Sequence, residues 1–333
     1  MMFIAHVAGL TKNLKLGTGV VSLPYHNPLW VADKLALLDH LTRGRVMLGV
    51  GPGALATDAA MIGIRPEEQR DALDFDMDVL MHLLTSDEPI SVETSRYKLV
   101  DARLQLDFYQ DPHPPIVAAA VVSPSGPRIA GKHGTGLISV GATMKAGVDV
   151  LAMHWDVVEE RAKEFGQTVS RDNWRVVGLM HLAETREKAF EDIRHGFKEW
   201  CDYLQNTAAA PQIQVSGDDF DGYIDWITNT GSAVIGTYKD AIEHIESLVE
   251  LSNGGFGNYL LFDHNWSNFA NKKHHYELFS EYVIPHFKRT NVRMKASEAS
   301  MRQVRAPLAQ AQQEAINDFR QRHDDEMKKK RGN

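Results

Sequence analysis

One continuous stretch, LGTGVVSLPYHNPLWVADKLALLDHLTRGRVMLGVGPG over Leu16–Gly53, decides the fold class. Residues Leu14–Leu23 are rich in valine and leucine and predict a buried strand. Asn27 and Pro28 then supply a side-chain cap and a proline at the first helical position, and apolar residues follow at helical spacing. Arg45–Gly51 predicts the next strand. The stretch is therefore a strand–helix–strand unit of the kind that builds parallel sheets.

The same alternation continues through the rest of the chain. Further strands are expected over residues 115–122, 137–141, 174–183, 232–235 and 258–263, and helices over 66–85, 125–133, 146–166, 184–205, 238–252 and 268–288. Residues 91–108 interrupt the rhythm with two short polar–apolar runs that predict a hairpin. Six clear strands and one short one, alternating with helices, leave two architectures: an open doubly wound sheet or a (β/α)₈ barrel.

Composition and charge exclude several classes of protein. The chain has 333 residues, with 36 Lys+Arg and 44 Asp+Glu, and a formal net charge of −8. Residues 289–333 carry a local charge of +5, which leaves −13 on residues 1–288 and argues against nucleic acid as a partner. No apolar run approaches the ~18 residues of a membrane span. The single cysteine, Cys201, excludes an internal disulfide, and with no signal-peptide pattern at the start a cytoplasmic setting is expected.

A glycine-rich segment follows the strand at Arg45–Gly51. The run Gly49–Ala54 matches the loose dinucleotide pattern GxGxxG/A, but the acidic residue that should end the following strand is missing. Gly51 and Gly53 instead predict a loop whose bare backbone lets a flat ligand lie against it.

A serine-containing loop, SPSGPR over Ser123–Arg128, follows the strand at 115–122 and opens a helix. Unpaired backbone N–H groups at a helix N-terminus, together with serine hydroxyls, form an anion site. The alternative is an ordinary serine cap with proline in the first turn.

Histidine and tryptophan side chains lie at two strand ends. His264 and Trp266 directly follow the last strand, and His181 lies near the end of the strand at 174–183. At the C-terminal mouth of a barrel these side chains would face a ligand, whereas packing is the alternative interpretation. His274 and His275 fall inside a helical pattern and are expected at the surface. The sequence contains no HExxH, GxSxG or P-loop motif, and no metal site is expected.

Three blocks, Leu16–Gly53, Pro114–Gly141 and Gly254–Trp266, resemble the bacterial luciferase-like family of flavin-dependent monooxygenases, and within it the limonene 1,2-monooxygenase-like group. The resemblance covers roughly residues 1–288 and implies that the blocks are the third to sixth and the eighth strands of a (β/α)₈ TIM barrel. It also implies that the first two barrel strands are lacking, so about six of eight are expected. Residues 1–288 would then be the barrel domain, and residues 289–333 a charged helical or partly disordered tail.

The resemblance further implies a flavin site. The family lays the flavin ring against the end of its third strand, here Thr18, Gly19 and Val20, beside the loop of Gly51 and Gly53. Its phosphate contacts fall on Ser123 and Gly126, in the loop already predicted to bind an anion. Pro52 stands where bacterial luciferase has a phosphate-contacting arginine, so that contact is not expected here.

The activity that the resemblance implies is oxygenation of a small apolar, terpene-like substrate, using O₂ and reduced FMN supplied by a separate flavin reductase. His264, Trp266 and His181 are the expected catalytic residues, and a homodimer is the expected assembly. Two alternatives on the same fold remain open: an F420-dependent oxidoreductase and a non-catalytic flavin-binding protein. The two lacking strands predict weak flavin binding and little turnover.

Overall fold

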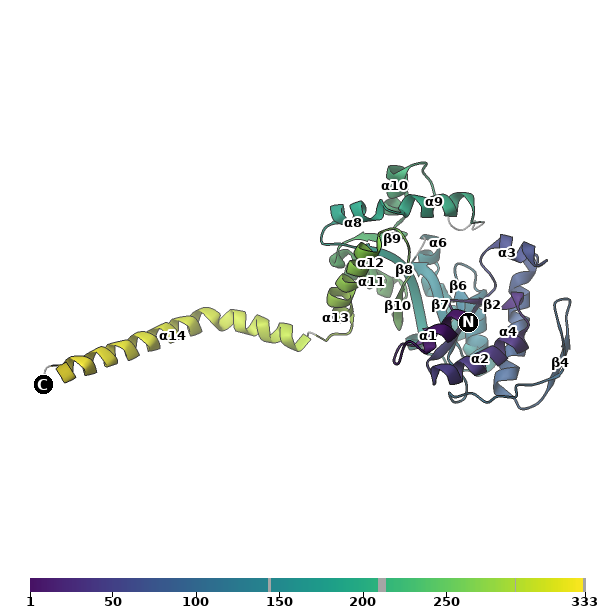
Figure 1. The fold of residues 1–333 in the computed structure, drawn as a ribbon, viewed down its shortest axis with the longest axis horizontal. Helices are drawn as coiled ribbons and strands as arrows, with labels where there is room; N and C mark the ends of the chain where they lie inside the picture. Colours follow the sequence, from purple (N-terminus) through teal and green to yellow (C-terminus); the bar gives the residue numbers. More distant parts are fainter. Residues whose placement is uncertain (143–144, 209–213, 291, 332–333) are drawn as a thin grey trace. The chain divides into compact units, whose positions relative to one another are not determined.

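The structure, a computed structural model, describes residues 1–142, 145–208, 214–290 and 292–331 (Figure 1). Contacts divide the chain into two compact units, Met1–Tyr276 and Glu277–Asn333. The domain boundary expected at residues 288 and 289 stays a prediction.

Six parallel strand positions form a half-barrel in the first unit (Figure 1). In spatial order they are β1 (Leu16–Gly17) continued by β2 (Val21–Ser22), β3 (Val46–Gly51), β6 (Ile116–Ala120), β7 (Gly136–Ala142), β8 (Trp174–Leu182) and β10 (Asn258–Leu261). The short β9 (Ala233–Gly236) pairs with the second half of β8, while β10 pairs with the first half. Among the described residues, no strand pairs with the outer edge of β1 and β2 or of β10. The predicted six-stranded parallel α/β architecture is confirmed.

Helices cover the outer face of this sheet. In the first part of the chain they are α1 (Met2–Ala8), α2 (Pro28–Thr42), α3 (Ala56–Met61), α4 (Gln69–Thr85), α5 (Ser125–His133), α6 (Lys145–Asp149) and α7 (Leu151–Phe165). Successive helices pack side by side, α2 on α4, α4 on α5 and α5 on α7, and their apolar faces bury the main core against the strands. The second part contributes α8 (Arg186–Ile193), α9 (Phe197–Asn206), α10 (Phe220–Thr230), α11 (Tyr238–Leu251) and α12 (Phe269–Leu278). Figure 1 shows α8, α9 and α10 grouped beside β9, away from α2 and α4.

Local signals in the sequence are confirmed at the helix ends. The Asn27 side chain accepts a hydrogen bond from the Leu29 amide at 3.0 Å and caps α2, with Pro28 in its first turn. Gly134 ends α5 in the left-handed conformation, with φ of 64°. The predicted hairpin is β4 (Ile90–Glu93) paired antiparallel with β5 (Lys98–Ala102).

A buried ion pair fastens that hairpin to the helical layer. Asp76 of α4 is fully buried, and both its carboxylate oxygens accept from the Arg96 guanidinium, at 2.5 and 2.7 Å. The Tyr97 hydroxyl donates to the same carboxylate at 2.7 Å. Burial and this hydrogen bond raise the pKa of Tyr97 well above its ordinary value.

Two predicted elements are broken where distant parts of the chain approach. The strand expected over Leu14–Leu23 is interrupted between Gly17 and Val21. There the Gly49 amide and carbonyl form hydrogen bonds with the Thr18 hydroxyl instead of with the backbone of a neighbouring strand. The helix expected over 184–205 is split at Gly196, whose amide donates to the Trp266 carbonyl at 2.9 Å. A Cβ on Gly196 would collide with the Asn265 carbonyl oxygen, so the two segments cross at backbone contact.

The second unit is helical. It contains a π-helical stretch over Phe279–Val283, then α13 (Ile284–Phe287) and the 40-residue α14 (Val292–Arg331). None of the described residues of α14 is buried. The sequence predicted a tail that is either helical or partly disordered, and Val292–Arg331 are helical. Among all described residues, no helix is both long and apolar enough to cross a bilayer.

Candidate functional site

Three predicted segments meet at the C-terminal ends of neighbouring strands. Because the strands are parallel and in register, Ser22 lies opposite Gly51, and Val50 lies opposite Ala118. A Cβ built on Gly51 would lie 2.9 Å from Val20 and 3.5 Å from the Ala119 side chain. The sheet thus brings the segment Thr18–Val20 and the loop after β3 to one edge, next to the end of β6.

The glycines at this edge have different roles. At Gly49 a Cβ would collide with the Thr18 carbonyl oxygen, so the absence of a side chain lets the interrupted strand lie close to β3. Around Gly19, by contrast, nothing lies within 4 Å of the position that a Cβ would take. Gly19, whose peptide bond to Val20 is cis, therefore offers open space beside bare backbone, as a flat ring requires.

Thr18 is tied into the sheet rather than left open. Its hydroxyl donates to the Gly49 carbonyl at 2.9 Å and accepts from the Gly49 amide at 2.8 Å. The side chain therefore fixes where Gly19 and Val20 lie. The Thr18 backbone is engaged as well, because its amide donates to the Met47 carbonyl at 3.3 Å and its carbonyl lies against Gly49.

The loop after β3 is held by two residues that sequence reasoning missed. The Gln69 amide group donates to the Tyr25 hydroxyl at 2.7 Å and to the Pro52 carbonyl at 3.1 Å. Gly53 has a φ of +98°, and a side chain there would collide with that hydroxyl. Burial raises the pKa of Tyr25, so it is a neutral hydrogen-bonding group.

The loop after β6 brings two serine hydroxyls to the start of α5. Ser123 and Ser125 lie with their hydroxyl oxygens 3.3 Å apart, and the Ser125 amide donates to the Ser123 hydroxyl at 3.3 Å. A Cβ on Gly126 would collide with the Ala119 carbonyl oxygen, so the first turn of α5 lies directly on β6. Pro127 has no N–H and the Arg128 amide donates to the Pro124 carbonyl, so the serine hydroxyls and the Gly126 amide are the groups that remain at the strand end.

The predicted histidines come together elsewhere, beside the end of β8. The ring of His181 lies 6.0 Å from that of His264 and 5.6 Å from that of His275, and all three side chains are buried. Nε2 of His264 is 2.7 Å from the Met180 carbonyl, and its Nδ1 accepts from the Trp266 amide at 3.3 Å. Since a carbonyl only accepts, His264 carries its proton on Nε2.

His275 was missed because the helical pattern placed it at the surface. That prediction is correct for His274, whose side chain is 41 % exposed, and wrong for His275, which is 3 % exposed. The Nδ1 atom of His275 accepts from the Leu182 amide at 3.1 Å, at the end of β8. Helix α12 therefore places His275 on its inward side, where the ring caps the end of β8.

Burial keeps the cluster uncharged. Burial, together with the neighbouring rings, lowers the pKa of His264 to about 4 and that of His275 to about 3. Burial also lowers the pKa of His181, and Asp192, 3.4 Å from its Nε2, offsets this only in part. Around neutral pH the three rings are hydrogen-bonding groups with little capacity to accept a proton.

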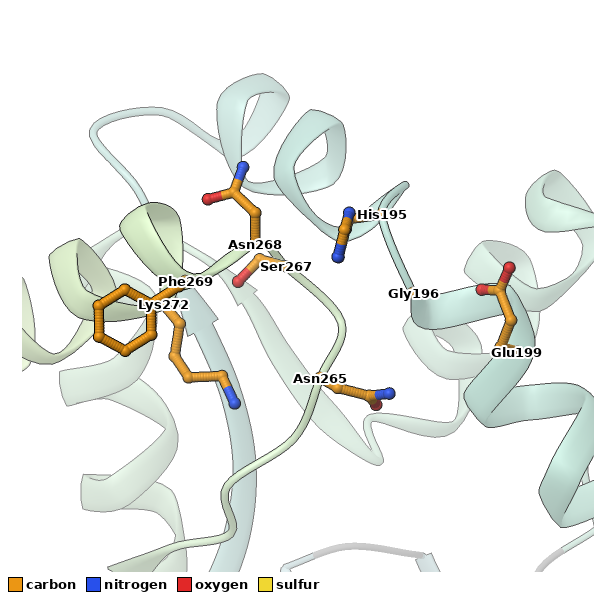
Figure 2. Close-up of a pocket in the computed structure, with 8 residues that line it drawn as sticks. All are labelled: His195, Gly196, Glu199, Asn265, Ser267, Asn268, Phe269 and Lys272. Atoms are coloured by element: carbon orange, nitrogen blue, oxygen red, sulfur yellow. The ribbon is translucent and has the colours of Figure 1, made fainter.

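Trp266 anchors a second hydrophobic cluster. It stacks on His264 with ring centroids 3.9 Å apart and meets Phe197 and Trp200 of α9 edge to face at 5.0 Å. A pocket of about 290 Å³ lies next to this cluster, between the start of α9 and the start of α12 (Figure 2). Its lining is mostly polar: His195, Gly196, Glu199, Asn265, Ser267, Asn268, Phe269 and Lys272.

A further buried histidine lies behind β7. The Trp174 indole donates to the Ser139 hydroxyl at 2.9 Å, and that hydroxyl lies 3.0 Å from Nδ1 of His154. Burial lowers the pKa of His154 to about 4. Its position follows from the spacing of the inward residues of α7, His154, Trp155 and Val158, a signal that the sequence contained. In the described part of the chain, no group of His, Cys, Asp and Glu side chains is arranged to hold a metal ion.

Known proteins are similar to this chain in sequence and in fold. The model of the luciferase-like monooxygenase family matches residues 1–267. Limonene 1,2-monooxygenase of Rhodococcus erythropolis is 45 % identical over 290 residues, which are 86 % of this chain and 72 % of the relative. The 3,6-diketocamphane monooxygenase of Pseudomonas putida, a type II Baeyer–Villiger enzyme solved with FMN, superimposes with a TM-score of 0.65. Its identity is 24 %, with 85 % of this chain and 82 % of that one covered.

An F420-dependent secondary alcohol dehydrogenase, solved with an F420–acetone adduct, has the same fold with a TM-score of 0.61 and 20 % identity. The alignment covers 84 % of this chain and 82 % of that one. At that identity the likeness concerns the fold alone. The family match and the 45 % identical relative together carry the assignment: the chain belongs to the luciferase-like monooxygenase family.

Proposed function

We propose that this protein is an FMN-dependent monooxygenase that oxygenates a small apolar, terpene-like substrate with O₂. The observation that carries the proposal is the joint edge formed by Gly19, with open space beside its backbone, and the serine loop at the start of α5. A flat ring suits the first place and a phosphate suits the second. The 45 % identical limonene monooxygenase supports the substrate class.

The residues present fit FMN. Thr18, Gly19 and Val20 would support the ring, with Gly51 and Gly53 shaping the adjacent loop. Ser123 and the Gly126 amide would hold the phosphate through hydroxyl and helix N-terminal contacts. When bound and reduced, FMN activates O₂ for oxygen transfer, and the protein's part is to bind, orient and exclude water.

The histidine cluster has a positioning role in this proposal. Both ring nitrogens of His264 are engaged by backbone groups, so this ring fixes the segment after β10 and places Trp266. Nδ1 of His181 is buried without a hydrogen-bond partner among the described residues, so a substrate reaches it only when the cluster opens. We therefore propose His181, His264 and Trp266 as the wall opposite the flavin segments, with His181 as the residue that contacts substrate.

We further propose that a separate flavin reductase supplies reduced FMN and that the enzyme is a homodimer. Both proposals follow from the family.

The substrate side of the proposed site is apolar. Ala118 and Ala120 of β6 are buried, and they add no charge to the strand end where the substrate would enter.

The decisive experiment mixes the protein with chemically reduced FMN, ¹⁸O₂ and limonene. The expected result is a small amount of oxygenated product that carries ¹⁸O, in line with the little turnover expected above, and no product when riboflavin or F420 replaces FMN. Hydride transfer between reduced F420 and a carbonyl substrate, without O₂, would instead establish the F420-dependent alternative. Flavin binding without either reaction would establish the non-catalytic alternative.

A further inference from the structure

The helix α14 has an apolar face whose side chains are exposed. Met294, Met301 and Leu308 follow one another at seven-residue spacing, with Val304 between them. Ile316 and Phe319 continue the same face after a shift of one residue. Met301, Leu308 and Phe319 are 53 %, 54 % and 72 % exposed, and no described residue of the helix is buried.

An apolar repeat of this period is the pattern by which helices pair. Seven-residue spacing keeps one face turned toward a partner over successive turns. A long helix whose apolar face meets only water gains nothing from tertiary packing, which normally supplies most helical stability. The other faces of α14 are polar and are crossed by intrahelical pairs such as Arg302–Glu298 and Arg322–Asp318.

The charges along α14 fall into three blocks, of which the last is the basic run Lys328–Arg331 with a charge of +4. Residues 292–310 contain four Lys+Arg and one Glu, a net charge of +3. Residues 311–327 contain two Arg and five Asp+Glu, a net charge of −3. Two copies aligned in parallel would set each block against its own sign, whereas two antiparallel copies set the first two blocks against each other and leave the basic run at 328–331 at the ends of the pair.

We propose that α14 is a self-association element, which pairs antiparallel with α14 of a second copy of this chain. The crossing point lies near Gln310, so residues whose numbers sum to about 620 lie level with each other. That register sets Met301 beside Phe319 and Val304 beside Ile316, so these four apolar residues meet. Pro307 and the bend of α14 partway along its length lie inside the paired region (Figure 1).

The direction of pairing is tested by cysteine cross-linking of the full chain. Cys201, the only cysteine, is buried and does not interfere. The Met294→Cys and Met327→Cys chains, joined by a short bis-maleimide, are expected to cross-link only when mixed, and Gln312→Cys is expected to cross-link to itself. Efficient self-cross-linking of Met294→Cys would show a parallel pair and overturn the proposal. So would no cross-linking at any of the three positions.

The surface is tested by sedimentation equilibrium. The double change Leu308→Asp and Phe319→Asp places two charges on the apolar face and is expected to halve the mass of the assembled species. The matched control, Gln303→Asp and Asn317→Asp, adds the same charge on the opposite face and is expected to leave the mass unchanged. Circular dichroism of both variants checks that α14 remains helical. An unchanged mass in the first variant, or an equal loss in both, would overturn the proposal.

Discussion

Nε2 of His264 lies 2.7 Å from the Met180 carbonyl oxygen, and this contact holds the exit of β10 against β8. The bond requires a neutral ring with its proton on Nε2. Because Nδ1 also accepts from the Trp266 amide, protonation of His264 would break the second contact. The fold around the aromatic cluster is therefore linked to pH.

Stability should fall as the pH is lowered from 6.5 toward 4. Over that range the unfolded chain binds protons at its histidines, while His264 and His275, with pKa values of about 4 and 3, stay neutral in the folded state. Each ring then lowers the free energy of unfolding by about 1.4 kcal/mol per pH unit. Below the folded-state pKa values the loss levels off. Denaturant unfolding at pH 7, 6 and 5 measures the slope.

His275→Asn should make that slope shallower by about 1.4 kcal/mol per pH unit. The asparagine oxygen replaces Nδ1 as acceptor for the Leu182 amide and does not titrate. His323→Asn, on the exposed α14, is the matched control and should leave the slope unchanged. An equal slope in His275→Asn and the parent chain would show that His275 is not protected from protonation.

Arg96→Met should destabilise the protein by about 3–5 kcal/mol, because it leaves the buried Asp76 carboxylate without its charged partner. Arg65→Met removes an exposed ion pair with Glu68 and should have a far smaller effect, because solvent screens that pair. Chemical denaturation of the two variants compares them directly. Similar losses would mean that the hairpin is not fastened through Asp76.

Gly49→Ala should destabilise the protein by about 1–3 kcal/mol or prevent folding, because the new methyl group meets the Thr18 carbonyl. Gly9→Ala is the control, since nothing lies within 4 Å of its Cβ position and its φ is −75°. Thermal unfolding of both variants provides the comparison. A fully stable Gly49→Ala protein would contradict the close approach of β3 to the segment at Thr18.

Most of the half-barrel could be predicted from the sequence because its signals are local. Apolar runs mark β3, β6 and β8, and the cap at Asn27 marks the start of α2. The breaks could not be predicted, because they arise between residues far apart in the chain. Gly196 splits a continuous helical pattern only because Asn265 and Trp266 cross it.

The candidate site likewise contains residues that could be predicted from the sequence and residues that could not. The glycine and serine loops were recognisable because they follow directly on strands. His275 was not, because one residue decides whether a helical histidine faces solvent or the strand end, and the helix phase depends on packing. The inward position of His154 was readable, since Trp155 and Val158 share its face of α7.

The central claim is that Ser123 and the start of α5 bind the phosphate of FMN, and one comparison tests it most directly. Fluorescence titrations measure the affinity for FMN and for riboflavin, which lacks the phosphate, in the parent chain and in Ser123→Asp. Thr185→Asp, at the start of α8, controls for a new carboxylate at a helix N-terminus. The account predicts that the parent and the control prefer FMN by about 1–3 kcal/mol and that Ser123→Asp loses this preference. Equal affinity of the parent for FMN and riboflavin, or an undiminished preference in Ser123→Asp, would contradict it.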